Sequence, residues 1–127
     1  MTAAACPCGS GRTLAACCGR FHDGEPAPDA ERLMHARYSA YVLGREDYLL
    51  ATWHPATRPT TLELDTVRRP QWLGLTVKAH TPRDEAHSTV EFVARYKLNG
   101  RAFRLHETSR FERVDGRWLY VDGEIRE

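Results

Sequence analysis

All four cysteines of this chain lie between positions 6 and 18, in the pattern Cys6-Pro-Cys8, eight further residues and then Cys17-Cys18. A disulfide framework would spread its bridges along the chain, and neighbours such as Cys17 and Cys18 are poorly placed to bond with each other. Zinc, by contrast, is borderline soft and accepts four thiolates in a tetrahedron. The cluster therefore predicts a small metal site in which these cysteines hold Zn²⁺.

The residues around the cysteines suit such a site. Gly9 and Gly11 let the backbone turn directly after Cys8, where a Cβ would be crowded. A helical turn over residues 13–18 would bring the second cysteine pair back to the first. Because four protein ligands leave no open position for water, we expect a structural site rather than a catalytic one. One alternative stays open, since His22 lies four residues beyond Cys18 and could replace it as the fourth ligand.

The composition is that of an ordinary globular protein. Of the 127 residues, 42% are hydrophobic and 28% are charged, and the formal net charge is +1. A nucleic-acid binder usually concentrates basic residues on one face, so this balance argues against strong nucleic-acid binding. No apolar run approaches the roughly 20 residues that span a bilayer, and the N-terminus lacks the segments of a secretory signal. We therefore expect a cytoplasmic protein without a membrane span.

The chain divides into two unequal parts. Residues 1–24 are rich in cysteine and glycine and show little apolar periodicity. Two prolines make the following stretch, residues 23–28, a short and stiff linker. Residues 29–127 carry the helical and strand periods of a folded domain. We therefore predict a metal-binding segment at 1–24 and one larger domain at 29–127.

Helices are expected at the beginning of the larger domain. An apolar arc at helical spacing predicts an amphipathic helix over residues 29–43, with Asp29 as its N-cap and Gly44 as its left-handed C-terminal stop. A second, shorter helix is predicted over residues 47–54, stopped by Pro55.

Strands follow the helices. Residues 66–73 are ambiguous between a short helix and a turn, but from Gly74 onward apolar residues recur with a period of two. Asn99-Gly100 and Asp115-Gly116 are strong signals for hairpin turns. Helices followed by an antiparallel meander predict an α+β domain with its helices packed on one face of the sheet.

Three polar residues fall where apolar ones are expected. Arg37 lies within the apolar arc of the first helix, and Glu107 and Ser109 share strand parity with Phe103 and Phe111. An unpaired buried charge is very costly, so we predict that Arg37 and Glu107 meet at a pocket between helix and sheet. The structural alternative is that Arg37 reaches the surface and Glu107 is exposed beyond a bulge.

Further candidates for this pocket are aromatic and histidine residues. Four aromatic residues could line it, although aromatic side chains in a small α+β domain usually belong to the core: Trp53, Trp72, Trp118 and Tyr120. His54 is a candidate acid or base, although a histidine directly before Pro55 more often ends a helix. No nucleophile–base pair and no phosphate-binding loop can be read from the chain.

The cysteine region resembles a known zinc module. The run Cys6-Pro-Cys8-Gly9-Ser10-Gly11, followed by Cys17-Cys18-Gly19, closely resembles the SEC-C motif, which is found at the C-terminus of the bacterial protein-secretion ATPase. That motif usually has His or Cys in the position of Cys18, so this chain matches it at every ligand. In the secretion ATPase the module contacts a chaperone and ribosomes.

The rest of the chain resembles the YchJ family of small bacterial proteins. Several motifs occur in the right order: Ala30-Glu31, Leu33-Met34, Arg37-Tyr38-Ser39-Ala40-Tyr41, Trp53-His54-Pro55, Val90-Glu91-Phe92-Val93-Ala94-Arg95-Tyr96, His106-Glu107 and Ser109-Arg110-Phe111. The resemblance implies a SEC-C segment followed by a domain similar to nuclear transport factor 2 (NTF2), in which helices lean into a curved antiparallel sheet with a conical pocket. Such domains often dimerise through the open face of the sheet, so a homodimer is compatible with this fold. The resemblance implies no activity.

Two functions are compatible with these motifs and with the resemblance. The first is a non-catalytic, zinc-containing adaptor, whose SEC-C segment docks a protein partner, secretion- or translation-associated by analogy, and whose pocket binds a small-molecule ligand. The second is an enzyme of the isomerase, dehydratase or hydrolase kind that uses the conical pocket. A ribosome- or RNA-associated factor is a weaker third reading, because the charge balance does not support it. We favour the adaptor, because the best-defined chemistry of the chain is structural.

Overall fold

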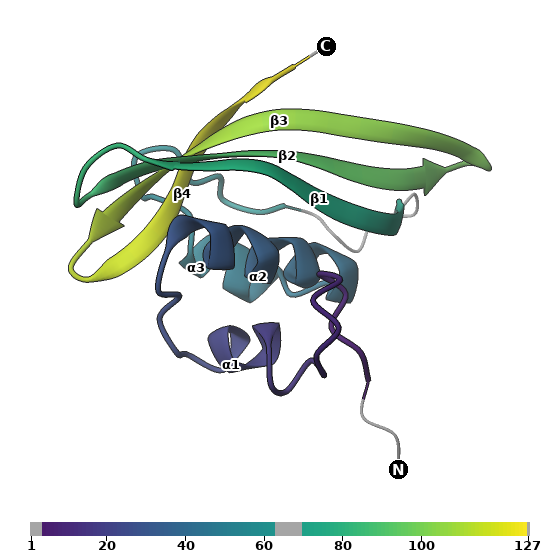
Figure 1. Cartoon of the computed structure of the whole chain (residues 1–127), viewed down its shortest axis with the longest axis horizontal. Coiled ribbons are helices and arrows are strands. Elements are labelled where there is room, and N and C mark those ends of the chain that lie inside the picture. Colours follow the sequence, from purple (N-terminus) through teal and green to yellow (C-terminus); the bar gives the residue numbers. More distant parts are fainter. Residues whose placement is uncertain (1–3, 63–69, 127) are drawn as a thin grey trace.

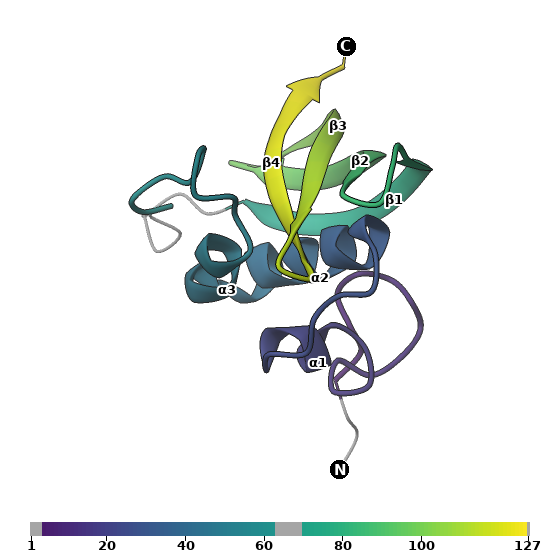
Figure 2. The ribbon, with the colours of Figure 1, turned by 90° about the vertical axis from the view of Figure 1, so that its left-hand side faces the viewer.

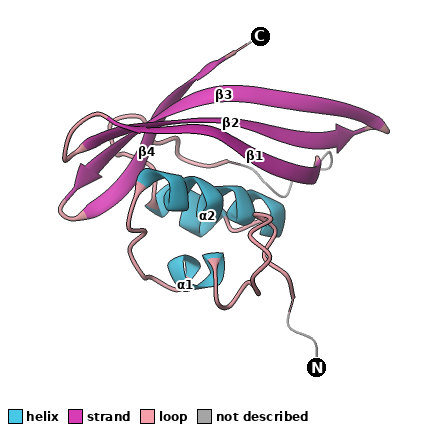
Figure 3. Ribbon diagram, viewed as in Figure 1, coloured by secondary structure: helices cyan, strands magenta, loops and turns pink. Residues whose placement is uncertain are grey.

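The computed structural model describes residues 4–62 and 70–126, in which helices precede strands along the chain (Figures 1 and 3). None of the helices in this part of the chain is long and apolar enough to cross a membrane. The elements are α1 (Cys18–His22), α2 (Ala30–Leu43), α3 (Glu46–Ala51), β1 (Gln71–Pro82), β2 (His87–Leu98), β3 (Arg101–Val114) and β4 (Arg117–Ile125).

The strands form one antiparallel meander in the order β1-β2-β3-β4. The tight turn between β2 and β3 has positive φ at Asn99 (53°) and Gly100 (80°), and the turn between β3 and β4 has positive φ at Asp115 (51°) and Gly116 (79°). A type I′ hairpin turn requires positive φ at both of its central residues. Both predicted hairpins are therefore confirmed.

The helices cover a single face of this sheet, and the predicted α+β architecture is confirmed (Figures 1 and 2). Helix α2 packs against β1, β2 and β4, while none of the described helices lies on the opposite face of the sheet (Figure 2). The pairing register shifts in β1 between Trp72 and Gly74 and between Val77 and Ala79. Bulges of this kind bend a strand and increase its twist. Both lie in β1, one of the three strands that pack on α2.

Helix α2 forms as its sequence predicts. The carboxylate of Asp29 accepts a hydrogen bond from the Arg32 backbone N–H at 2.7 Å, and Gly44 ends the helix with φ of 74°. Most of the predicted apolar arc is buried, with Leu33 at 1% exposure, and its last residues, Tyr41 and Val42, are half-buried. Arg37 lies on the same arc and is also buried, at 3% exposure. It therefore does not reach the surface.

Helix α3 ends earlier than the predicted residue 54, and Pro55 is not what stops it. The hydroxyl of Thr52 donates to the Tyr48 carbonyl at 2.8 Å and caps the last turn. The chain then pairs with β4, because the Tyr120 N–H donates to the Thr52 carbonyl at 2.8 Å and the His54 N–H donates to the Tyr120 carbonyl at 2.7 Å. This pairing along the edge of the sheet takes residues 52–54 out of the helix.

The first strand also differs from its expected limits. Strand β1 begins at Gln71 rather than at Gly74, so part of the ambiguous stretch 66–73 is strand. Residues 66–69 lie outside the part of the chain that the structure describes. Trp72 packs against Tyr38 and Tyr41 of α2, with ring centroids 5.7 and 6.0 Å apart. These contacts with the helix favour an extended chain at the beginning of β1.

The metal segment (residues 4–24) packs into the same buried cluster as the larger domain. Cys6, Cys18 and Phe21 belong to one hydrophobic cluster with Leu33 and Leu49 of the helices. In Figures 1 and 2 this segment lies against α2 on the side away from the sheet. Helix α2 is thus covered by the sheet on one side and by the metal segment on the other.

We expect Asp29→Ala to lower the free energy of unfolding by about 1 kcal/mol, because it leaves an N-terminal N–H of α2 without its acceptor. Urea denaturation followed by circular dichroism measures this change. Asp29→Ser is the matched control, since a serine hydroxyl can accept the same hydrogen bond, and we expect it to retain most of the stability. Equal losses in both variants would contradict the capping role.

Candidate metal centre and pocket

A short hairpin-like loop presents the first cysteine pair. The Leu14 N–H donates to the Ala4 carbonyl and the Cys6 N–H to the Arg12 carbonyl, both at 2.9 Å. Between these bonds the chain reverses through Gly9 and Gly11, whose φ values of 84° and 85° are easily adopted only by glycine. The loop therefore turns back directly after Cys8, as the sequence predicted.

Tight turns followed by α1 present the second pair. The predicted helical turn over residues 13–18 forms as successive turns, in which the Ala16 N–H donates to the Thr13 carbonyl and the Cys17 N–H to the Leu14 carbonyl, both at 3.1 Å. The Gly19 N–H also donates to the Leu14 carbonyl, at 2.8 Å. A Cβ on Gly19 would lie 2.7 Å from that carbonyl oxygen, so the close return of the chain requires glycine here.

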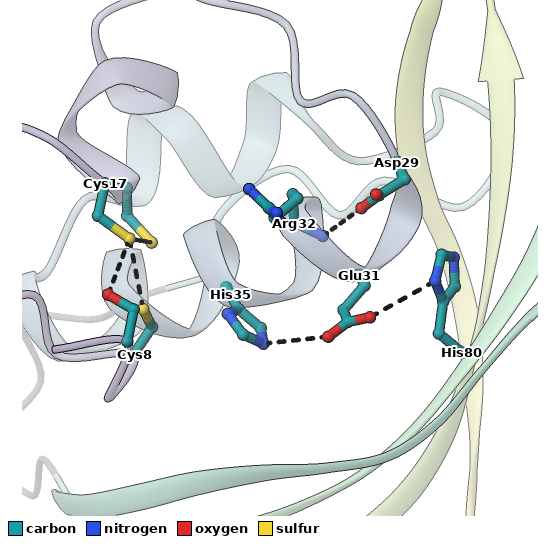
Figure 4. Close-up of polar contacts among 9 residues, drawn as sticks. Cys8, Cys17, Asp29, Glu31, Arg32, His35 and His80 are labelled. Carbon is teal, nitrogen blue, oxygen red and sulfur yellow. Dashed lines mark hydrogen bonds and ion pairs between the residues drawn. The ribbon is translucent and has the colours of Figure 1, made fainter. Parts of the chain in front are cut away.

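The four sulfurs converge to the spacing of a tetrahedral metal site. Their Sγ atoms all lie within 4.8 Å of one another. The Cys8 and Cys17 sulfurs are 3.7 Å apart, and those of Cys17 and Cys18 are 4.0 Å apart (Figure 4). Bonds of about 2.3 Å from zinc to sulfur place tetrahedral sulfurs about 3.8 Å apart. The four cysteines can therefore hold a metal ion after small shifts of their side chains.

The site is largely shielded from water. Cys6, Cys8 and Cys18 are buried, and Cys17 is half-buried beside the Ser10 hydroxyl, 3.2 Å from its sulfur. From the other side, the buried Ser39 hydroxyl of α2 lies 3.5 Å from the Cys6 sulfur. Hydroxyl contacts of this kind orient thiolate ligands.

The thiolates of the four cysteines require a nearby cation to balance their charge. Hydrogen bonding from Cys18 lowers the pKa of the Cys8 thiol to about 2, so one thiolate forms readily. The same contact with Cys8 raises the pKa of Cys18, and burial raises the pKa of Cys17. Several adjacent thiolates in a buried site repel one another, and a metal ion is what allows all four to ionise.

His22 is not a ligand in this arrangement. Its Nε2–H donates to the Ala36 carbonyl of α2 at 2.9 Å, and its ring packs on Tyr48 with centroids 4.7 Å apart. Burial lowers the pKa of His22, which keeps the ring neutral. His22 therefore fixes α1 to the helices, and Cys18 completes the set of sulfurs.

A chain of polar side chains that the sequence did not single out begins beside the cysteines. Figure 4 shows His35 next to Cys8, with Glu31 and then His80 beyond it. One carboxylate oxygen of Glu31 lies 4.0 Å from His35 and the other 3.5 Å from His80. Glu31 and His35 are one helical turn apart on α2, which is the spacing that could have revealed their contact. The chain links the metal segment to β1.

Arg37 and Glu107 both line one cavity of about 250 Å³, which lies between α2 and the sheet where the pocket was predicted. Ser109, a third predicted residue, also lines it. Two of the aromatic candidates, Trp72 and Tyr120, also line it. Sequence reasoning did not name Tyr38 and Tyr41 as part of the wall, although both lie on the apolar arc of α2. The remaining lining residues are mainly apolar or aromatic: Met34, Tyr38, Tyr41, Trp72, Phe92, Ala94, Leu105 and Tyr120.

The guanidinium of Arg37 is held by its own neighbours. Its Nη1 donates to the Leu49 carbonyl and to the Thr52 hydroxyl, both at 2.8 Å, at the C-terminal end of α3. It also lies over the rings of Trp53 and Tyr120, at 5.0 and 4.6 Å from their centroids. Burial lowers the Arg37 pKa, and these contacts offset part of that cost.

Glu107 is held separately from Arg37. The Ser109 hydroxyl donates to Glu107 Oε2 at 2.5 Å. A Cβ added to Gly123 of β4 would overlap the Glu107 carboxylate, so an alanine there would force that side chain to move. The register of β3 and β4 shifts at Arg110 and Phe111, where β4 carries the extra residue Val121, and Glu107 stays on the inner face. The ion pairs of the described residues do not include one between Arg37 and Glu107.

The structure places the other predicted pocket residues outside this cavity. Trp53 is not among the lining residues, and its ring contacts both the Arg37 guanidinium, at 5.0 Å, and the Tyr120 ring, at 4.9 Å. The His54 ring lies 3.6 Å from the carboxylate of Glu112, because the backbone of His54 follows the edge of β4. Trp118 lines a different cavity, of about 200 Å³, at the junction of α1, α3 and β4. His54 and Trp118 were therefore wrongly grouped with Arg37.

Comparisons with known proteins agree with this architecture. A family model for the middle, NTF2-like domain of YchJ matches residues 29–123, and a model of the SEC-C motif matches residues 4–20. The chain belongs to the YchJ family. The expected family and its NTF2-like domain are thus confirmed.

Relatives of known sequence and structure cover nearly the whole chain. A UPF0225 protein of Ralstonia nicotianae is 58% identical over 133 residues, covering 96% of this chain and 92% of the relative. A UPF0225 protein of Chromobacterium violaceum is 61% identical over 126 residues, covering 94% and 92%. The solution structure of a SEC-C motif containing protein from Rhodopseudomonas palustris is 33% identical, with a TM-score of 0.84 and coverage of 96% and 98%. Both parts of this YchJ-family chain therefore occur together in these proteins.

We expect Cys18→Ser to lose tightly bound zinc, because Cys18 supplies one of the four sulfur ligands. We expect His22→Gln to retain about one equivalent, because His22 is not one of the ligands. Elemental analysis after dialysis of zinc-loaded protein measures this difference. His22→Gln keeps a side-chain N–H that can donate to Ala36 and serves as the matched control. Loss of metal from His22→Gln with retention by Cys18→Ser would reverse the ligand assignment.

We expect Gly123→Ala to destabilise the fold by about 1–3 kcal/mol, because the new Cβ meets the Glu107 carboxylate. Glu107→Ala should relieve that overlap, so the double variant should be more stable than the sum of the single losses predicts. Urea titrations of the two single variants and the double variant measure the coupling. Gly74→Ala is the control, since a Cβ there meets only Arg95, at 3.5 Å. Additive losses would show that the two positions are independent.

Proposed function

We propose that this YchJ-family protein is a non-catalytic adaptor, in which a structural Zn²⁺ holds a docking surface and the NTF2-like domain binds a small ligand. The proposal rests on the four cysteine sulfurs, whose Sγ atoms all lie within 4.8 Å of one another. Thiolate ligands select zinc among the common structural metals, and four of them leave no position for a substrate. The metal's contribution is therefore to the fold.

The docking surface is the cleft beside the cysteines. Its volume is about 270 Å³, and its walls come from the metal segment and from the first turns of α2. Arg12, Arg20 and Arg32 all line it, and Glu31 is the one acidic residue among the lining residues that the structure describes. Arg12 and Arg32 are exposed. A partner with an acidic contact surface fits this cleft, because complementary charge steers association and excludes wrong partners.

The partner is a protein, by analogy with the SEC-C module of the secretion ATPase, and a secretion- or translation-associated one on the same analogy. The metal segment suits this role because it is rigidly attached. Ser39 meets Cys6, and His22 meets the Ala36 carbonyl, so two contacts fix the segment to α2. A rigid surface loses little conformational entropy on binding.

The cavity between α2 and the sheet supports the second part of the proposal. Ligand sites are typically concave and mostly apolar, with a few polar groups that set orientation. Arg37, Glu107 and Ser109 supply the polar groups, and aromatic side chains supply much of the wall. The same convergence favours the alternative function, a small-molecule enzyme. Glu107→Gln would then abolish turnover of a substrate in a protein that remains folded, whereas an adaptor has no turnover to lose.

We expect a protein partner to copurify with the zinc-loaded chain from the native cell and to be lost from Cys6→Ser/Cys8→Ser, because that variant cannot hold the metal. Arg12→Ser/Arg32→Ser keeps all four sulfurs and should lower the recovered partner at least about tenfold, equivalent to about 1.4 kcal/mol. Quantitative mass spectrometry of the recovered proteins measures both effects.

Arg101→Ser/Arg104→Ser is the matched control for this experiment, because it removes two exposed arginines at the far end of β3. The control should recover the partner as well as the unaltered chain does. A partner that binds equally to the cysteine variant, or equally to Arg12→Ser/Arg32→Ser, would contradict docking through the cleft.

A further inference from the structure

The described residues that line the cavity between α2 and the sheet carry no net charge. Arg37 supplies one positive charge and Glu107 one negative charge, and no other lining residue in the described part of the chain is ionised at neutral pH. Burial raises the pKa of Tyr38, Tyr41 and Tyr120, so these phenols keep their protons. A fully charged ligand would therefore leave one of the two opposite charges beside a like charge or without a partner.

The two charges are also kept apart. Nη1 of Arg37 is occupied by Leu49 and Thr52, and the Glu107 carboxylate is held by Ser109. A guanidinium has more N–H donors than these oxygens accept, and a carboxylate has more lone pairs than one hydroxyl fills. The cavity thus offers a donor on the α2 side and an acceptor on the β3 side, with space between them.

The walls favour a flat ring. Trp72 packs edge-on against Tyr38, with centroids 5.7 Å apart, and continues outward as a row with Tyr96 and Phe103, at 5.5 and 5.4 Å. Phe103 is 40% exposed, so this row reaches solvent at the end of the sheet. Aromatic faces of this kind bind planar groups by stacking and edge contacts.

We propose that the cavity binds a neutral, planar aromatic ligand whose head group is an amide or lactam. The carbonyl of such a group accepts from Arg37, and its N–H donates to Glu107, so both charges gain a hydrogen bond without a new charge entering the site. The ring lies against Trp72 and Tyr41, and any substituent follows the aromatic row outward. This ligand class rests on the proposed binding function of the NTF2-like domain and makes it specific.

Three probes of nearly the same shape test the head group: benzamide is neutral, benzoate is an anion and benzamidine is a cation. Titration of ¹⁵N-labelled protein with each probe gives Kd from the shifts in two-dimensional NMR spectra. We expect benzamide to bind with a Kd on the order of 1 mM, ordinary for a ligand of this size, and at least about tenfold more tightly than either charged probe. The indole signal of Trp72, which lines the cavity, should shift, and that of Trp118 should not.

Glu107→Gln tests the origin of the selectivity. With the negative charge removed, Arg37 leaves the cavity positive, and we expect benzoate to replace benzamide as the preferred probe. Glu91→Gln is the matched control, because Glu91 lies in β2 and its carboxylate pairs with His106 at 2.7 Å, outside the cavity. The control should keep the preference for benzamide. If Glu107→Gln fails to fold, the Kd values of the three probes for the unaltered chain still test the preference for a neutral head group.

The outcomes separate the ligand class from the binding function. Preference of the unaltered chain for benzoate or benzamidine, with shifts at Trp72, would overturn the neutral amide and leave a ligand-binding cavity. Absence of binding by all three probes would overturn both the ligand class and the pocket part of the proposed function, while docking through the metal segment would be unaffected. Shifts at Trp118 alone would place the binding in the other cavity and overturn the proposal.

Discussion

The burial of the Arg37 guanidinium constrains much of this structure. Taking a charge out of water costs several kcal/mol unless hydrogen bonds and neighbouring groups replace the solvent. Here the Leu49 carbonyl and the Thr52 hydroxyl accept from Nη1, and the rings of Trp53 and Tyr120 cover the guanidinium. These partners come from the end of α3, the segment that follows it and β4. One side chain of α2 thereby fixes how α3 meets the sheet.

Helix α2 also carries the metal segment on its opposite side. Ser39, which meets the Cys6 sulfur, and Ala36, whose carbonyl accepts from His22, are both fully buried. Arg37 lies between them in sequence and faces the cavity. The helix is therefore apolar or buried over most of its circumference, as expected for a helix packed on two sides. The metal centre and the cavity share this helix without sharing any ligand or lining residue.

Local signals in the sequence predicted much of the fold, because their physics is local. The cysteine spacing, the Asp29 cap, Gly44 and the two hairpin turns each depend on a few neighbouring residues. What sequence reasoning missed depends on distant partners. Helix α3 ends early because residues 52–54 pair with Tyr120, and His54 leaves the cavity for the same reason. The close approach of the Glu107 carboxylate to Gly123 joins residues sixteen positions apart in the chain, and no local pattern reveals it.

The separation of Arg37 from Glu107 bears on why the cavity exists. Two opposite charges in a largely buried site would gain most stability by closing into a direct ion pair with shared hydrogen bonds. Instead each is held by its own side of the fold, Arg37 by α3 and Glu107 by Ser109 and the space over Gly123. An arrangement that served stability alone would have no reason to hold them apart around a cavity. Binding of a molecule between them supplies that reason, and it requires both charges to be fixed in place before the molecule arrives.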